Sequence, residues 1–235
     1  MKKELLIASV FAATVAGAGT VTTSNAMAYV PVNNAPCALQ DSKRMYMVVA
    51  PFEGYDSDQI SVADVIQTAG LAAGDELLLR KEDGKGYNVW TLQADKTWKP
   101  VADITFSASG MQSSSGTSPN VPLISRGQAF WVKTAATSLS LFGNSAGTTA
   151  KTVAIPAGWS MVGSTVPTGS VKISLINDCS TGDLIMLADG TRYQKKSAVW
   201  KKYANKIWAD VVDTDAIPAG TAFWYMTQSG KSLTF

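Results

Sequence analysis

Short apolar runs separated by turn-forming residues dominate the chain. Residues 45–50, 76–80 and 87–93 in the first half, and residues 159–162 and 184–187 in the second half, are runs of this kind. Apolar runs of this length that are bounded by Gly, Asp or Asn predict β-strands, because a buried helix needs ten or more residues.

Only two stretches, residues 61–68 and 171–176, have apolar residues at a spacing that fits a helical turn. We expect each of them to form a short helix or a strand. Long amphipathic repeats are absent elsewhere, which places the protein in the all-β or mostly β class.

The order of the runs is repeated along the chain. Residues 89–101 align without gaps on residues 199–211, and in both segments a Val-Trp pair is followed by a second Trp eight positions after the first. Blocks of Met-Val, Gly-Asp and Gly-x-Ala-Phe-Trp recur in the same order. Collinear blocks of this kind predict two tandem copies of a five- or six-stranded, sandwich- or barrel-like module, related by a pseudo-two-fold duplication.

The chain divides into five predicted parts. They are a signal peptide (1–28), an N-terminal arm (29–44), a first β-module (45–142) with a Ser- and Gly-rich insertion (107–120), a linker (143–155) and a second β-module (156–235). Because of its composition, the insertion is expected to be a surface loop or disordered.

The N-terminal residues predict export. Lys2 and Lys3 precede a short apolar stretch, residues 5–16, and small residues follow at Ala26 and Ala28. This order is typical of a secretory signal peptide cleaved after Ala28. We therefore expect a secreted protein in the extracellular space, at the cell surface or in the periplasm, with no membrane span after cleavage.

Two cysteines, Cys37 and Cys179, remain after this cleavage. An oxidising compartment favours a disulfide between them over two free thiols. The alternative is a pair of buried thiols.

Composition excludes several kinds of chemistry. The chain has 20 Lys and Arg, 18 Asp and Glu and no His, which gives a net charge of +2. The lack of His excludes Ser-His-Asp and Cys-His catalysis and His-based zinc sites. The near-neutral charge gives no support for a nucleic-acid partner. No glycine-rich phosphate loop is present, and no cofactor or metal is expected.

Carboxylates remain as candidate catalytic groups, because aspartic peptidases and glycosidases need only a pair of them. The repeat alignment pairs Asp103 with Asp213 and, as a second choice, Asp75 with Asp183. The sequence Asp-Thr from Asp213 onward is similar to the first two residues of the Asp-Thr-Gly motif of aspartic peptidases. The structural alternative is that these carboxylates cap turns at strand ends.

Four tryptophans on the two aligned hairpins, Trp90, Trp98, Trp200 and Trp208, are candidates for ligand binding. If a hairpin turn has two residues, its two Trp side chains lie on opposite faces, and if the turn has three residues they share a face. Each ring is expected either to pack in a core or to form an exposed platform for sugar rings.

The repeated blocks resemble a β-module of secreted bacterial proteins, mostly of uncharacterised function. The resemblance is carried by Pro-Ala-Gly-Trp at residues 156–159, by Gly-Asp at 182–183 and by Pro-x-Gly-x-x-Phe-Trp at 218–224. The first copy departs from the pattern at its opening, where residues 44–46 replace Gly-Trp. The resemblance implies a β-sandwich or barrel-like module at the cell surface and implies no catalytic residue.

Two functional hypotheses follow from the sequence. The first is a secreted or cell-surface β-module protein that binds an extracellular glycan or glycoprotein through the hairpin tryptophans. The second is a secreted aspartic-type peptidase that degrades extracellular glycoproteins such as mucin, with one Asp contributed by each repeat. A glycosidase with a more widely spaced carboxylate pair is a third alternative.

Overall fold

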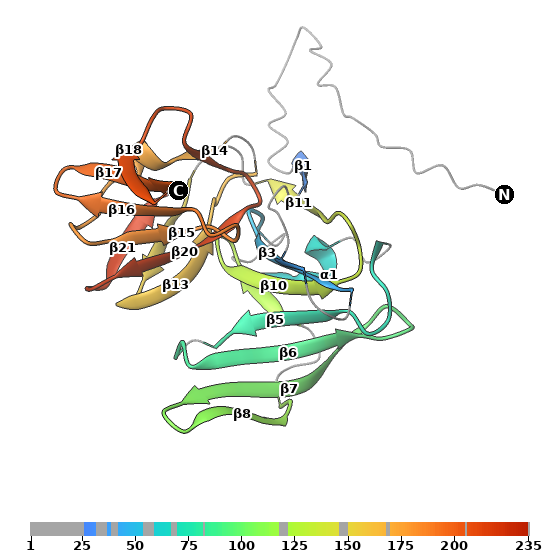
Figure 1. Ribbon diagram of the computed structural model, residues 1–235. Helices are drawn as coiled ribbons and strands as arrows, with labels where there is room; N and C mark the ends of the chain where they lie inside the picture. Colours follow the sequence, from blue (N-terminus) through green and yellow to red (C-terminus); the bar gives the residue numbers. More distant parts are fainter. Residues whose placement is uncertain are drawn as a thin grey trace, which may run out of the picture.

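The structure is a computed structural model that describes residues 26–31, 37–38, 42–53, 59–66, 70–81, 83–117, 122–145, 150–167, 170–204 and 206–234. Within these ranges the protein is mostly β, as predicted, with a seven-stranded sheet, a six-stranded sheet and four two-stranded sheets (Figure 1). None of these sheets closes on itself, so the barrel-like alternative is wrong.

The seven-stranded sheet is the centre of the first module. Its strands lie in the order β2 (Cys37–Ala38), β3 (Arg44–Val49), β10 (Ala129–Thr134), β5 (Glu76–Arg80), β6 (Gly86–Leu92), β7 (Trp98–Ser107) and β8 (Gly110–Ser115). One face of the sheet is covered by helix α1 (Val62–Val65), by the pair β4 (Gln59–Ser61) and β9 (Leu123–Ser125), and by β11 (Ser140–Ser145), which pairs with β1 (Ala26–Pro31). These elements enclose the first hydrophobic core.

The six-stranded sheet is the centre of the second module. Its strands lie in the order β13 (Gly158–Gly163), β20 (Ala222–Thr227), β15 (Leu184–Met186), β16 (Arg192–Lys196), β17 (Val199–Ala204) and β18 (Ile207–Asp210). Its covered face packs against β14 (Ser170–Lys172) with β19 (Ala216–Pro218), the 3-10 turn η2 (Ile173–Leu175), and β12 (Thr152–Ile155) with β21 (Lys231–Thr234). We call this face the inner face and the opposite one the outer face, in both modules.

The strand orders of the two sheets can be compared place by place. From β3 and from β13 they run β3-β10-β5-β6-β7-β8 and β13-β20-β15-β16-β17-β18. Backbone bonds fix the register: Gly74 N donates to Leu92 O (2.9 Å) and Gly182 N donates to Lys195 O (2.8 Å). Leu92 therefore takes the place of Lys195, and Trp98 takes the place of Trp200.

This correspondence differs from the gapless sequence alignment, which matches Trp98 with Trp208. The β6–β7 hairpin lies in the interior of its sheet and corresponds to β16–β17, whereas the similar sequence at β17–β18 forms the edge of the second sheet. The alignment followed local similarity, and strand pairing places the two segments one strand apart.

The modules touch through the outer faces of β3 and β10 in one sheet and β13 and β20 in the other. Two isolated bridges join them, Val48 with Thr221 and Gln128 with Val162. A third apolar cluster spans the contact; its buried members are Met47, Val49, Ala129, Met161 and Ala222. Each module thus has its own core, and a smaller apolar cluster joins the two.

The contact between the modules requires a glycine at position 163. A Cβ atom at Gly163 would lie 2.8 Å from the Cβ of Val49 and 2.9 Å from the carbonyl oxygen of Thr221. Beside it, Arg126 is buried and donates to Thr165 O (2.5 Å) and to Glu53 Oε1 (2.6 Å). These contacts fix the two sheets against each other.

Three sequence predictions need correction. Residues 110–115 of the expected loop insertion form strand β8, because their backbone pairs with β7 although the side chains stay exposed. The predicted linker contributes the end of β11 and strand β12. The predicted Cys37–Cys179 disulfide is not formed: Cys37 pairs with Met45 in the first sheet, whereas Cys179 is a free thiol that packs against the core of the second module.

The predicted signal peptide lies mostly outside the described residues, and its expected cleavage site falls within β1. No helix in the described part of the chain is long and apolar enough to cross a membrane.

Candidate functional site

The β17–β18 hairpin exposes an aromatic pair at the edge of the second sheet. Ala204 pairs with Ile207, which leaves a turn of two residues, and Tyr203 pairs with Trp208. A two-residue turn places Trp208 on the face opposite to Trp200, as the sequence argument requires. Trp200 is buried in the core, and Tyr203 and Trp208 lie together on the outer face.

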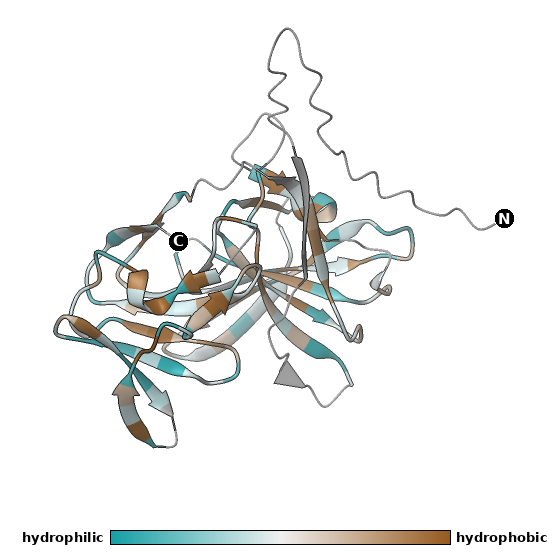
Figure 2. Ribbon diagram, turned by 90° about the horizontal axis from the view of Figure 1, so that it is seen from above, coloured by the Kyte–Doolittle hydropathy of each residue, from teal (hydrophilic) through white to brown (hydrophobic). Residues whose placement is uncertain are grey.

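The two rings form a compact patch that solvent can reach. Their centroids are 5.0 Å apart with planes tilted by 49°. Tyr203 is 37% exposed and Trp208 is 36% exposed. Figure 2 shows the hairpin extending from the module at the lower left, with apolar and hydrophilic segments next to each other along it.

Two cations border this patch. Lys196 Nζ lies 4.5 Å from the centroid of a Trp208 ring, and Arg192 is the cross-strand neighbour of Tyr203. Both side chains are exposed, and neither forms an ion pair with a described carboxylate. We call Arg192, Lys196, Tyr203 and Trp208 the edge patch.

The tryptophans of the first hairpin lie differently. Trp90 and Trp98 are 2% and 3% exposed and share the inner face, because Leu92 pairs with Trp98 across a longer turn. Within that turn Lys96 N donates to Gln93 O (3.0 Å). The prediction of a ligand-binding ring therefore fails for Trp90, Trp98 and Trp200, which are core residues, and only Trp208 remains.

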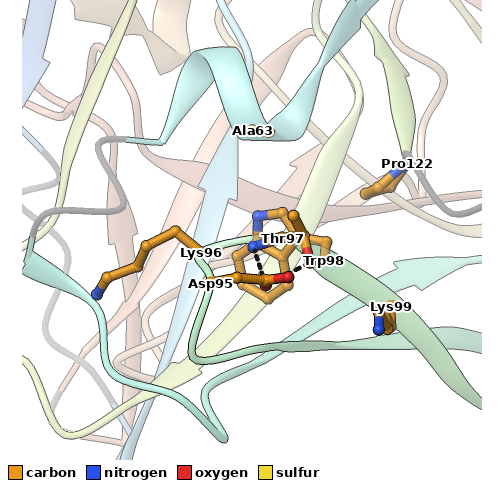
Figure 3. A pocket seen from close by; sticks show the side chains of 7 residues that line it. All are labelled: Ala63, Asp95, Lys96, Thr97, Trp98, Lys99 and Pro122. Atoms are coloured by element: carbon orange, nitrogen blue, oxygen red, sulfur yellow. Dashed lines mark hydrogen bonds between the residues drawn. The ribbon is translucent and has the colours of Figure 1, made fainter.

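A pocket of about 450 Å³ lies beside the buried Trp98. Figure 3 shows it between the turn of the β6–β7 hairpin, with Lys96 and Lys99, and the side chains of Ala63 and Pro122. The indole Nε1 of Trp98 has no hydrogen-bond partner, but it is enclosed by protein and so is out of reach of a ligand in the pocket. Trp98 lines the pocket, but at 3% exposed it offers little ring surface for stacking.

Asp103 and Asp213 are not brought together. Asp103 lies on β7, where its Oδ2 accepts from Thr117 N (3.1 Å) and Oγ1 (2.9 Å). Asp213 is exposed in the turn after β18, in the other module. In Figure 1 the strands β7 and β18 lie on opposite sides of the contact between the modules. By strand pairing, Ala204 takes the place of Asp103, so the repeat does not generate this pair.

Asp215, the third residue of the Asp-Thr-Asp segment at residues 213–215, has a structural role. Asp215 is buried, and its carboxylate accepts from Val212 N (3.0 Å) and from Lys202 Nζ (2.6 Å). Burial alone would raise the pKa of Asp215, but these hydrogen bonds outweigh it and lower the pKa. The segment is a turn held by an ion pair.

Asp75 and Asp183 occupy matching places in the two sheets, and each is 2% exposed. Asp75 Oδ2 accepts from Ala72 N (2.9 Å) and from Thr134 Oγ1 (2.6 Å), and its Oδ1 lies 3.6 Å from Lys43 Nζ. Each carboxylate closes a turn within its own module, so they do not form a shared catalytic pair.

Asp183 sits in the stronger network of the two. Its Oδ2 accepts from Ser180 N (2.8 Å), Tyr225 Oη (2.6 Å) and Lys231 Nζ (2.6 Å). Burial would raise the pKa of Asp183, but these donors reverse that effect and lower it. Burial, followed by the bond to Asp183, raises the pKa of Tyr225, so its hydroxyl stays a donor.

The site residues predicted from the sequence did not include Tyr203, Lys196 or Arg192. The available signal was the density of basic residues around the second hairpin, with Lys-Lys at residues 195–196 and again at 201–202. Within the described part of the chain, no cluster of three or more Cys, Asp or Glu side chains could hold a metal ion.

No family model, curated protein or solved structure matches this chain. The resemblance to a module of secreted bacterial proteins therefore stays a prediction, and the functional argument rests on the geometry of the edge patch.

Proposed function

We propose that this protein binds an extracellular glycan through the edge patch. The observation that carries the proposal is the exposed Tyr203–Trp208 pair, which lies on the outer face of an edge hairpin. The two rings contribute little to the core of the module. They leave apolar surface in contact with water and add little to the stability of the fold. Conversely, exposed Tyr and Trp side chains are the residues that dominate binding sites.

The shape of the pair suits a sugar ring. A pyranose has an apolar face of C–H groups that can lie on an aromatic ring, while its hydroxyl groups bond to polar neighbours. The rings sit on paired strands, so their separation is set by the backbone and little ordering is needed on binding. Exposed ring faces together with nearby Arg and Lys donors provide both contacts.

We propose further that the protein is exported and that its two modules arose by duplication. Export is supported by the basic and apolar N-terminal residues with small residues before position 29. Duplication is supported by the matching strand orders, by the matching places of Asp75 and Asp183, and by the paired bridges between the modules. The residues of the edge patch do not recur at the matching positions of the first module, which has an aromatic pair elsewhere, Tyr87 with Phe106.

Affinity electrophoresis and calorimetry against neutral and acidic polysaccharides and mucin test the binding proposal. Trp208→Ala should weaken binding by about 30-fold, which corresponds to about 2 kcal/mol for a central aromatic contact. The matched control is Phe106→Ala, because Phe106 is an exposed aromatic on the outer face of the edge hairpin of the other sheet. If no glycan binds, or if both variants lose affinity equally, the proposal is wrong.

A further inference from the structure

We infer that the glycan bound by the edge patch is anionic, with carboxylate-bearing sugars such as uronic acids. The inference rests on the proposed function and adds the chemical class of the ligand. It is carried by two cations that lie beside the exposed aromatic pair and form no ion pair with a described carboxylate.

Positive charge is concentrated around the patch although the whole chain is almost neutral. Residues 192–210 contain six Lys and Arg and one acidic residue, Asp210, whereas the net charge of the chain is +2. A local excess of this size attracts anions even when the total charge does not.

Two of these lysines are already neutralised by ion pairs. Lys201 Nζ lies 2.6 Å from Asp210 Oδ1, and Lys202 Nζ lies 2.6 Å from Asp215 Oδ1. Lys195 Nζ lies 5.7 Å from the ring centroid of Trp200, which is on the inner face. Lys206 is exposed in the hairpin turn, and Arg192 and Lys196 are the two cations that flank the rings on the outer face.

Strand pairing places these two cations on the same face as the rings. Arg192 pairs directly with Tyr203, and Tyr203 pairs with Trp208, so the three side chains project to one side of the sheet. Lys196 Nζ lies over Trp208 at 4.5 Å. A sugar ring stacked on the pair would have its carboxylate within reach of a guanidinium or an ammonium group, and such charge-assisted bonds are strong.

The matching positions of the first module lack every one of these groups. By register, Val89 stands for Arg192, Gln93 for Lys196, Ala102 for Tyr203, and Ser115 for Trp208. The inference therefore requires one anionic site per chain, on the second module alone.

Single-stranded nucleic acid is the other anionic polymer that binds by stacking on aromatic side chains. Proteins that bind it use a charged groove along the backbone and a series of stacking rings. The edge patch has two rings on the β17–β18 hairpin and two cations on the neighbouring strand β16. This small group suits a single sugar unit better than a nucleotide chain.

The test compares two ligands that differ only in charge. Calorimetry would measure the affinity of the purified protein for a galacturonate hexasaccharide and for its fully methyl-esterified form. At low salt the acid should bind about tenfold more tightly than the ester, and at about 0.5 M salt the difference should nearly vanish, because exposed charges are then screened. A hexathymidylate oligonucleotide is the third ligand and should bind more weakly than the acid.

Charge-neutralising variants show which cations cause the preference for the acid over the ester. Arg192→Gln combined with Lys196→Gln should weaken binding of the acid by about tenfold and leave binding of the ester unchanged. Lys99→Gln combined with Lys172→Gln removes the same charge from exposed positions outside the patch and should change neither affinity by more than about twofold. Unfolding curves check that all variants stay folded.

Each outcome decides the matter. Equal binding of acid and ester, an unchanged acid affinity in the Arg192 and Lys196 variant, or tighter binding of the oligonucleotide would overturn the anionic class. In the first two cases glycan binding itself would still stand. Absence of binding to any glycan would overturn the proposed function and the inference together.

Discussion

The β6–β7 and β17–β18 hairpins have similar side-chain patterns but occupy different places in their sheets. In β6–β7 both tryptophans lie on the inner face and are buried, with β5 on one side of the hairpin and β8 on the other. In β17–β18 one tryptophan is buried and the other is exposed, and β18 is an edge strand.

Two physical differences cause this contrast. The shorter turn of β17–β18 reverses the face of its second tryptophan, since side chains alternate along a strand. In β6–β7, the longer turn leaves both tryptophans on one face, and a bulge between Val89 and Trp90 shifts the register of the pairing beyond it by one residue. One residue in a turn therefore decides whether a Trp serves folding or faces solvent.

The largest expected effect is the difference in stability between variants of Trp98 and of Trp208. Trp98→Ala should lower the free energy of unfolding by about 3–5 kcal/mol, because it leaves a cavity in the core. Trp208→Ala should lower it by less than about 1 kcal/mol, because the ring is partly solvated. Urea unfolding followed by circular dichroism measures both, and similar losses in the two variants would contradict the comparison.

Asp183 and Asp75, which occupy matching places in the two sheets, allow the interiors of the two modules to be compared. Asp183→Asn should cost about 2–3 kcal/mol at neutral pH, because it leaves the largely buried Lys231 without its counter-charge. Asp75→Asn should cost about 1–2 kcal/mol, because Asp75 accepts fewer close bonds. Denaturant titrations of both variants beside the parent protein give the two costs.

The cost of Asp183→Asn should also depend on pH. The folded pKa of Asp183 lies below its usual value of 3.8, so the carboxylate stabilises the fold above that pH. This stabilisation is lost as the pH falls through the folded pKa. The difference between parent and variant should be constant near neutral pH and shrink below about pH 4. A difference that grows on acidification would refute the assignment.

The smallest expected effect is the change in stability when a lysine in each of the two hairpin turns is replaced by glycine. Lys96 and Lys206 both have φ of 64°, a left-handed conformation that favours glycine. Lys206→Gly should stabilise the protein by about 0.5–1 kcal/mol. Lys96→Gly should gain less, because Lys96 Nζ also donates to Leu71 O (2.6 Å). Thermal melts of the two variants distinguish these outcomes, and a larger gain at Lys96 would be contrary to them.

Much of the fold was predictable from periodicity. The runs at 45–50, 76–80 and 159–162 are strands β3, β5 and β13, and the hairpin turns lie where expected. Local apolar patterns define such strands because each must bury at least one face. Strand β8 was missed because its Ser-rich residues bury neither face and are held by backbone pairing alone.

The candidate site was less predictable. A gapless alignment scored the Val-Trp similarity of two hairpins and paired Asp103 with Asp213, whereas non-local strand pairing matches Asp103 with Ala204. Whether Trp208 is exposed depends on a turn length and on its position at a sheet edge, and neither is visible in a repeat alignment. The cluster of Arg192 and Lys196 beside the rings depends on the same pairing.

Oxidative footprinting with mass spectrometry tests the central claim most directly, because it reports the solvent access of each tryptophan. Without ligand, Trp208 should be modified much faster than Trp90, Trp98 and Trp200, and a saturating galacturonate hexasaccharide should protect Trp208 while leaving the exposed Trp159 unchanged. Modification of Trp208 as slow as that of Trp98, or no protection of Trp208 by bound ligand, would contradict the account.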